Sequence, residues 1–493
     1  MSVAIALLGV LAVKCLLAGF IPITADEAYY AIWGAYLSGG GYDHPPMIGF
    51  VLYPLLQFGH HALTLRLPAI LASLILGVVT YLYLKKDDPV RAALASVLLM
   101  IAPISLFNII ITTDTPLFIF SFLSVMCVLQ ALKKNDDWRC FAFGGLFLGL
   151  AFFSKYFACL LGVAYAVYFL FIAPNRARLI GLGLLALFTL PFVVQNIYWN
   201  YQHDWPNILF NIYNRNNDMG FSIKTILQYL LILFYLITPP LLLAVAKFPK
   251  QELKQQAVFY FFFIPLLLFF LLSSFKPIGV HWPLAFIPLI YVWAGLYLST
   301  KRLRQLLKFT IFWTGIQLIL IISLLFTPLK SIQHRNVLAL SYNKIVYFFH
   351  HKAINDLLKE KYPQAIIYAS PNYADACLFF YDTDQYASVF LTGSYHGRED
   401  DLITNFKNFN NKNFLIFSRT PLVYNDYKPY FQRVSLHTFH YEQALFYYLI
   451  GTKFNYSVYR QKILKVINDT YWIDPPYLPH APSFFYLKYN LRT

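Results

Sequence analysis

The sequence predicts a mostly α-helical membrane protein with many spans, followed by a smaller α/β domain outside the membrane. Three observations support this fold class. Of the 493 residues, 58% are hydrophobic and only 13% are charged, whereas an ordinary soluble domain is about 25% charged. Apolar runs long enough to cross a bilayer fill the chain up to about residue 328. After Lys330 the composition turns to Asn, Lys, Tyr, Asp and Phe, without another spanning run.

The composition also excludes several classes of protein. Disordered chains, coiled coils and secreted disulfide scaffolds need polar, heptad or Cys-rich sequence, and the five cysteines here provide no disulfide framework. The net charge is +16, which in a soluble protein would suggest nucleic acid. In a membrane protein it reflects cytoplasmic loop anchors and attraction to anionic lipid or phosphate. We therefore expect membrane lipids, and no nucleic acid, as partners.

The apolar runs predict about eleven transmembrane helices. At about 20 apolar residues per span, they cover residues 3–21, 65–84, 92–111, 116–132, 141–153, 156–173, 179–198, 226–246, 257–274, 283–299 and 307–327. The first run has no basic segment before it and no small-residue cleavage site, so we interpret it as a retained helix rather than a signal peptide. The segment 141–173 is either one long helix or two short ones.

The distribution of basic residues predicts the orientation. One set of alternate loops carries most of them, whereas the other set carries only Arg66, Lys155, Arg215, Lys224 and Lys276. By the positive-inside rule, the amino terminus is inside, and the loop 22–64 and everything after residue 330 are outside. The same bias favours two short helices in 141–173, with Lys155 near the outer turn between them.

The composition change divides the chain into a transmembrane domain, residues 1–329, and an outer domain, residues 330–493. In the outer domain, residues 365–369 and 414–417 are short apolar runs typical of buried strands. Residues 372–380 between them are typical of a helix. Alternation of strand and helix predicts a small α/β fold.

Acidic residues of the outer loops lie in unusual local contexts. Asp26 and Glu27 directly follow the first span, where two adjacent carboxylates cost desolvation and mutual repulsion. In the alternative interpretation, Asp26 caps the following helix and Glu27 lies in its first turn. Asp43 and His44 lie in a loop that three glycines and two prolines keep non-helical.

Two further contexts are more open to a structural explanation. Asp114 lies at the outer junction of two spans. A carboxylate there is suited to a substrate-binding site and equally to capping the start of the second helix. His203 and Asp204 lie between two tryptophans, where they suit a metal or a sugar. Interfacial anchoring explains the tryptophans equally well.

The outer cations complete a chemical pattern. A lone Lys such as Lys155 near the end of a span either snorkels to the surface or clamps a phosphate head group. The outer loops of this many-span protein thus carry both carboxylates and isolated cations. This combination is suited to an enzyme that transfers a sugar from a polyprenyl phosphate. The phosphate leaving group needs cations or a metal, and the acceptor hydroxyl needs a carboxylate base.

Five stretches of the sequence occur in the order seen in one family, namely residues 26–30, 42–48, 66–68, 113–117 and 154–156. On these residues the chain resembles the bacterial branch of the dolichyl-phosphate-mannose–protein mannosyltransferase superfamily (glycosyltransferase family 39-like), which includes the aminoarabinose lipid A transferases. The resemblance is strongest over about residues 20–205. Residues 276–283 are similar to the family's late outer loop, and the tail is similar in placement and general α/β character.

The resemblance implies the glycosyltransferase C-type membrane fold, a site on the periplasmic side of the bacterial inner membrane and a polyprenyl-phosphate-linked sugar as donor. It implies catalysis by Asp26, Glu27 and Asp43, and a divalent metal, of unknown identity, held by Asp43 and His203. Contacts to the lipid phosphate or sugar fall to His44, Arg66, Asp114, Lys155 and Lys276. His44 replaces a lysine of the aminoarabinose transferases, and because a neutral His is a weaker phosphate partner, Lys155 carries more of that role.

We therefore expect an integral membrane glycosyltransferase that moves a sugar onto lipid A, a glycan or a protein, inverting the anomeric centre by one direct displacement. The alternatives are an O-antigen ligase or polymerase, a lipid or sugar transporter or flippase, and a non-catalytic membrane assembly protein. Against transport, no inverted repeat of hydropathy is present. Convergence of Asp26, Asp43, Asp114 and Lys155 in one outer cavity would favour the transferase.

Overall fold

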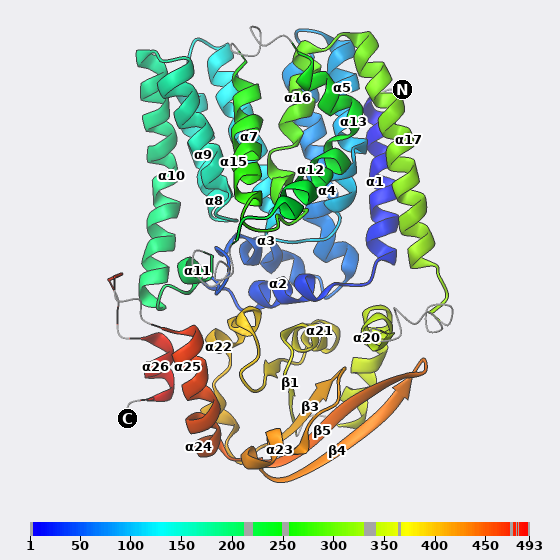
Figure 1. The fold of residues 1–493 in the computed structure, drawn as a ribbon, viewed down its shortest axis with the longest axis vertical. Helices are drawn as coiled ribbons and strands as arrows, with labels where there is room; N and C mark the ends of the chain where they lie inside the picture. Colours follow the sequence, from blue (N-terminus) through cyan, green and yellow to red (C-terminus); the bar gives the residue numbers. More distant parts are fainter. Residues whose placement is uncertain are drawn as a thin grey trace. The chain divides into compact units, whose positions relative to one another are not determined.

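The computed structural model describes residues 3–211, 220–248, 256–329, 342–362, 366–473, 477–479, 481 and 483–491. The chain forms two compact units (Figure 1). The helical unit comprises Met1–Ile21, Ala62–Gln195 and Asn217–Leu325, and the mixed unit comprises Pro22–His61, Asn196–Asn216 and Phe326–Thr493. The sequence analysis assigned Pro22–His61 and Asn196–Asn216 to the membrane domain. In the structure, these two segments pack with the C-terminal residues. The predicted boundary at residues 329 and 330 adjoins residues 330–341, which lie outside the described residues, and it stays a prediction.

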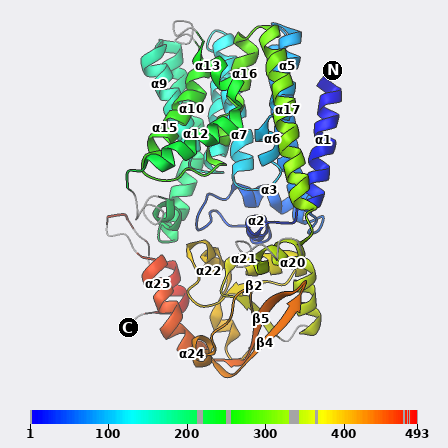
Figure 2. The ribbon, with the colours of Figure 1, turned by 45° about the vertical axis from the view of Figure 1, so that its right-hand side comes forward.

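The helical unit consists of apolar helices and short connections (Figure 2). Its helices are α1 (Val3–Phe20), α4 (Ala62–Leu84), α5 (Pro89–Ile101), α6 (Pro103–Phe107), α7 (Asp114–Lys133), α8 (Trp138–Phe152), α9 (Ala158–Val167) with the π-helical turn η1 (Tyr168–Ile172), α10 (Arg176–Gln202, whose last residues belong to the mixed unit), α12 (Ile223–Ile237), α13 (Pro239–Ala246), α15 (Ala257–Ser273), the 3₁₀ turn η3 (Trp282–Ala285), α16 (Pro288–Tyr297) and α17 (Thr300–Leu325).

Within the described ranges, five helices are long and apolar enough to cross a membrane, namely α1, α4, α7, α10 and α17. The pair α12 and α13 passes the same test but is bent by 102° at its break. Every predicted span coincides with one or more helices, although several are shorter than a bilayer requires. The predicted many-span helical body is confirmed, and the number of spans stays a prediction.

A proline divides one predicted span, and the segment 141–173 forms two helices. The run 92–111 separates into α5 and α6 because Pro103, at the first turn of α6, has no N–H to continue the preceding helix. The segment 141–173 forms two helices, α8 and α9, as the charge bias predicts. Gly145 lets α8 approach α10 closely, since a Cβ there would lie 2.6 Å from the Leu185 carbonyl oxygen.

The basic loop residues gather at one end of the helical unit. Lys133, at the end of α7, pairs with Asp87 in the α4–α5 loop at 2.6 Å. Arg178, at the start of α10, pairs with Asp136 in the α7–α8 loop at 3.3 Å. This clustering agrees with the predicted charge bias. Because α7 runs from Asp114 to Lys133, Asp114 lies at the opposite end of the helical unit.

The mixed unit contains a five-stranded sheet in the order β2-β1-β3-β5-β4. Its strands are β1 (Ile366–Ser370), β2 (Ala387–Val389), β3 (Asn413–Ser418), β4 (Phe431–Tyr441) and β5 (Ala444–Phe454). β1 pairs in parallel with β2 and β3, so that Tyr368 lies opposite Ala387 and Leu415. β5 runs antiparallel to β3 and β4. The predicted strands at 365–369 and 414–417 are confirmed as β1 and β3.

The helices of the mixed unit carry several residues of the candidate site. They are α2 (Ala25–Ala35), α3 (Met47–Leu56), α11 (Pro206–Leu209), α20 (Tyr342–Lys361), α21 (Tyr373–Thr383), α22 (Glu399–Ile403), α23 (Tyr424–Tyr427), α24 (Tyr456–Tyr459), α25 (Lys465–Tyr471) and α26 (Phe484–Tyr489), with the 3₁₀ turns η4 (Tyr395–Gly397), η5 (Phe406–Phe409) and η6 (Lys428–Tyr430) and the π-helical turn η7 (Arg460–Leu464). The helix expected at 372–380 is α21, which Asn372 caps by accepting from the Ala374 N–H. α21 packs against α2.

Candidate active site

The two adjacent acids at the start of α2 have different environments. Thr24 is the N-cap, and its hydroxyl accepts from the Glu27 N–H at 3.2 Å. Glu27 Oε2 in turn accepts from the Thr24 N–H at 3.0 Å, which completes a capping box. Glu27 is fully buried, whereas Asp26 is exposed. The carboxylate of Glu27 thus closes the helix end. Its predicted catalytic role stays a prediction, and Asp26 is the candidate base.

Removing this cap is expected to destabilise the protein without touching Asp26. Thr24→Ala loses the capping hydroxyl, which is typically worth about 1 kcal/mol, and the midpoint of thermal unfolding in detergent should fall. Ser222→Ala is the matched control, because Ser222 is the N-cap of α12 but makes no side-chain cap hydrogen bond. An equal fall in both variants would contradict the assignment of Thr24.

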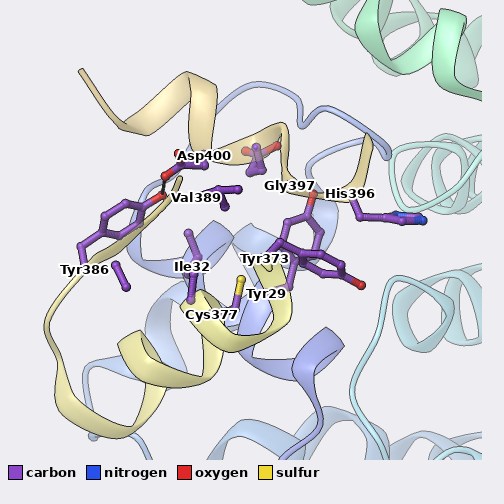
Figure 3. A pocket seen from close by; sticks show the side chains of 12 residues that line it. Tyr29, Ile32, Tyr373, Cys377, Tyr386, Val389, His396, Gly397 and Asp400 are labelled. Atoms are coloured by element: carbon purple, nitrogen blue, oxygen red, sulfur yellow. Dashed lines mark hydrogen bonds between the residues drawn. The ribbon is translucent and has the colours of Figure 1, made fainter. Parts of the chain in front are cut away.

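Tyrosines from α2 and α21 link Asp26 with Asp43. The Tyr29 hydroxyl donates to Asp43 Oδ1 at 3.1 Å. The Tyr29 ring meets the Tyr373 ring edge to face, with centroids 5.9 Å apart (Figure 3). Burial raises the pKa of Tyr373, and the charge of Asp26 and a hydrogen bond to its carboxylate raise it further. The mixed unit therefore brings Asp26 and Asp43, from two parts of the predicted site, around one pair of tyrosines.

Asp43 and His44 lie in a buried turn between α2 and α3. Only 4% of Asp43 and 8% of His44 is exposed. The preceding glycines are required by the packing, because a Cβ on Gly41 would lie 1.9 Å from the Trp33 ring. The loop thus holds its acid and imidazole in place rather than presenting them on an open surface turn.

The predicted metal ligand His203 contacts Trp199, and a metal held by Asp43 and His203 stays a prediction. His203 stacks on Trp199 with ring centroids 4.2 Å apart, and its Nδ1 lies 2.8 Å from the Trp199 carbonyl oxygen. Within the part of the chain that the structure describes, no group of three or more His, Cys, Asp and Glu side chains is arranged to hold a metal ion. We therefore derive no chemical step through a metal at Asp43 and His203.

In the helical unit, Asp114 and Lys155 form a buried ion pair. Lys155 Nζ donates to both Asp114 oxygens at 2.8 Å, and the two side chains are 6% and 10% exposed. His281 Nε2 lies 3.8 Å from Asp114 Oδ2, and half of its side chain is exposed. The turn after α8 and the start of α7 thus place a cation, a carboxylate and an accessible imidazole together.

The two remaining predicted cations have other contacts. Arg66 is fully buried, and its Nη1 donates to the carbonyls of Ala18 and Ile21 at 2.7 Å. Ala18 lies in the last turn of α1 and Ile21 directly follows the helix, so Arg66 supplies partners for carbonyls at that helix end. Its predicted contact to the lipid phosphate stays a prediction. Lys276 Nζ lies 5.5 Å from the centre of the Trp282 ring.

Sequence reasoning missed four residues of these two groups. Tyr29 and Tyr373 contact the predicted acids, His281 approaches Asp114, and Glu399 accepts a hydrogen bond from the loop of Asp43. His281 stands in a stretch that the resemblance already marked. Glu399 and Tyr373 lie in the tail, which offers no comparable signal.

Comparison with known proteins supports the predicted class. Residues 43–199 match the family model of the dolichyl-phosphate-mannose-protein mannosyltransferases. The match confirms the predicted resemblance and the glycosyltransferase class for this segment. It contains Asp43, His44, Arg66, Asp114 and Lys155, whereas Asp26, Glu27, His203 and Lys276 lie outside it. No curated protein matches the sequence.

Solved structures of one further protein share the fold. The chain is similar to ArnT from Cupriavidus metallidurans, both in the apo state and bound to undecaprenyl phosphate. In each case the TM-score is 0.61 and the identity is 14%, over 90% of this chain and 97% of ArnT. The predicted glycosyltransferase C-type fold is therefore confirmed along nearly the whole chain.

Proposed function

We propose that this protein transfers a sugar from a polyprenyl-phosphate donor to a hydroxyl acceptor at the periplasmic face of the bacterial inner membrane. The observation that carries the proposal is the buried Asp114–Lys155 pair, which lies within the family match and at the end of α7 away from the basic loops. A cation beside apolar helices suits the phosphate of a membrane lipid. ArnT, which shares the fold, has been solved with such a lipid phosphate bound.

The reaction is a single displacement. The acceptor oxygen attacks the anomeric carbon, and the bond from that carbon to the phosphate oxygen breaks. The electron pair leaves with the polyprenyl phosphate, and the hydroxyl proton passes to the carboxylate of Asp26. One displacement inverts the anomeric centre.

Each unit of the structure contributes one requirement of this reaction. Negative charge grows on the departing phosphate, so a fixed cation such as Lys155 stabilises the transition state more than the ground state. The exposed carboxylate of Asp26 is suited to accept the acceptor proton, which is general base catalysis. That the two groups share one cavity stays a prediction.

The proposal is tested by incubating the purified protein in detergent with extracted polyprenyl-phosphate sugars and a panel of lipid A, glycan and peptide acceptors. We expect a mass increase of one sugar residue on one acceptor class, and release of polyprenyl phosphate. Detergent solution has no second compartment, so a transporter or flippase would give no product there. Absence of product with every pair would overturn the proposal.

A further inference from the structure

The loop that carries Asp43 and His44 is held by side chains from distant parts of the mixed unit. Glu399 Oε2 accepts from the Tyr42 N–H at 2.7 Å. Asn207 donates to the Gly41 carbonyl at 3.1 Å, and Asn211 donates to the Asp43 carbonyl at 2.8 Å. An irregular loop has no helix or sheet partners for its backbone groups, and buried groups of this kind need a partner. The side chains therefore take the place of a regular hydrogen-bond ladder.

Aromatic rings enclose the same loop. A Cβ on Gly40 would lie 2.3 Å from Trp199, so the backbone rests directly on that ring. Tyr42 is fully buried, and its ring meets those of Phe210 and Trp472 at centroid distances of 6.0 and 5.4 Å. Because the rings pack closely, the loop has little freedom to shift. The direction of its backbone is then fixed by the few polar contacts from Glu399, Asn207 and Asn211.

Glu399 differs from the acids that follow it on α22. Asp400 accepts from the Tyr386 hydroxyl at 2.7 Å, and Asp401 pairs with Arg398 at 3.1 Å, so each has a partner in its own domain. Glu399 instead reaches a backbone N–H 357 residues earlier in the sequence. It is 4% exposed, and burial, together with the charge of Asp43, raises its pKa to about 8. The side-chain hydrogen bond of this buried acid goes to the Asp43 loop and not to the described C-terminal residues around it. We therefore attribute its burial to a role in holding the loop.

We propose that Glu399 is a positioning residue of the transferase, which fixes the Tyr42 N–H and thereby the direction in which Asp43 and His44 point. The proposal rests on the proposed function. It makes the C-terminal residues a working part of the active site rather than a separate binding domain. A glutamine at this position keeps the shape of the side chain and an oxygen that accepts from the Tyr42 N–H.

Three variants test this role, with kcat and KM measured for one donor and acceptor pair. Glu399→Ala leaves the Tyr42 N–H without its acceptor, and we expect kcat to fall about 100-fold, the loss typical of a misplacement near 1 Å, with little change in KM. Glu399→Gln should restore kcat to within about threefold, since it keeps the acceptor oxygen. Asp400→Ala is the control, because Asp400 has the same helix and similar burial but bonds to Tyr386 and Thr404 instead of the loop.

The outcomes separate positioning from stability and from the function itself. Equal loss of kcat in Glu399→Ala and Asp400→Ala, or wild-type kcat in Glu399→Ala, overturns the role of Glu399. Hydrogen exchange of residues 40–46 supplies a second measurement that needs no activity, and we expect faster exchange in Glu399→Ala alone. Unchanged exchange there would also overturn the proposal. No transfer by the wild type, with faster exchange in Glu399→Ala, would refute the proposed function and leave only the anchoring of the loop.

Discussion

Asp26→Asn is expected to slow sugar transfer by about 10²- to 10⁴-fold, the usual loss when a general base is removed. Asparagine keeps the size of the side chain but cannot accept the acceptor proton. Asp26 is exposed at the start of α2, and the cap of that helix is made by Thr24 and Glu27. The thermal unfolding midpoint should therefore stay at the wild-type value while the rate falls, as measured by product formation at saturating substrates.

The neighbouring acid is the matched control for this prediction. Glu27→Gln removes the same charge one position later, but from a fully buried side chain that bonds to Thr24. We expect a lower unfolding midpoint and near wild-type turnover per folded molecule. Transfer by Asp26→Asn at the wild-type rate, or loss of turnover only in Glu27→Gln, would refute the assignment of the base to Asp26.

Much of the helical unit could be predicted from the sequence, because long apolar runs permit little but spanning helices. The charge bias was enough to separate α8 from α9. The 102° bend between α12 and α13 lies inside one continuous apolar run. The bend falls at Thr238, directly before Pro239 and Pro240, which cannot continue the hydrogen bonding of α12. Hydropathy alone does not register such a break.

In the tail, the apolar strands β1 and β3 could be predicted, whereas the long β4–β5 hairpin could not. β4 is mostly exposed and polar, so it lacks the buried run that marks a strand. Its extended form depends on its pairing with β5, for example His437 opposite Tyr448. The sequence shows no local sign of that partner.

The site was predictable where chemistry is local and unpredictable where contacts are distant. The spacing of Thr24 and Glu27 is a capping-box signature, so the sequence was sufficient to predict that Glu27 caps the start of α2. Arg66 bonds to two backbone carbonyls, which leave no sequence signal. Glu399 meets its loop across 357 residues, and a single sequence offers no means of pairing the two.

Lys155→Met is expected to give the second large effect, a loss of both stability and transfer. Asp114 would keep a buried charge, with His281 at 3.8 Å as its remaining ionisable neighbour among the described residues. Breaking a buried pair from one side typically costs about 3–5 kcal/mol. The unfolding midpoint in detergent should fall strongly, and transfer should fall with it, so this variant alone cannot separate a structural lysine from a functional one.

The double variant Asp114→Asn with Lys155→Met makes that separation. With both charges removed, the penalty for the unpaired carboxylate disappears, and the unfolding midpoint should return to near the wild-type value. If Lys155 stabilises the departing phosphate, transfer should remain about 10²- to 10³-fold slow, as for other groups that stabilise transition-state charge. Lys155→Arg retains the cation and should keep more of the rate than the double variant. Recovery of wild-type transfer together with stability in the double variant would instead make the pair a structural contact, and the proposed phosphate partner would have to be sought elsewhere.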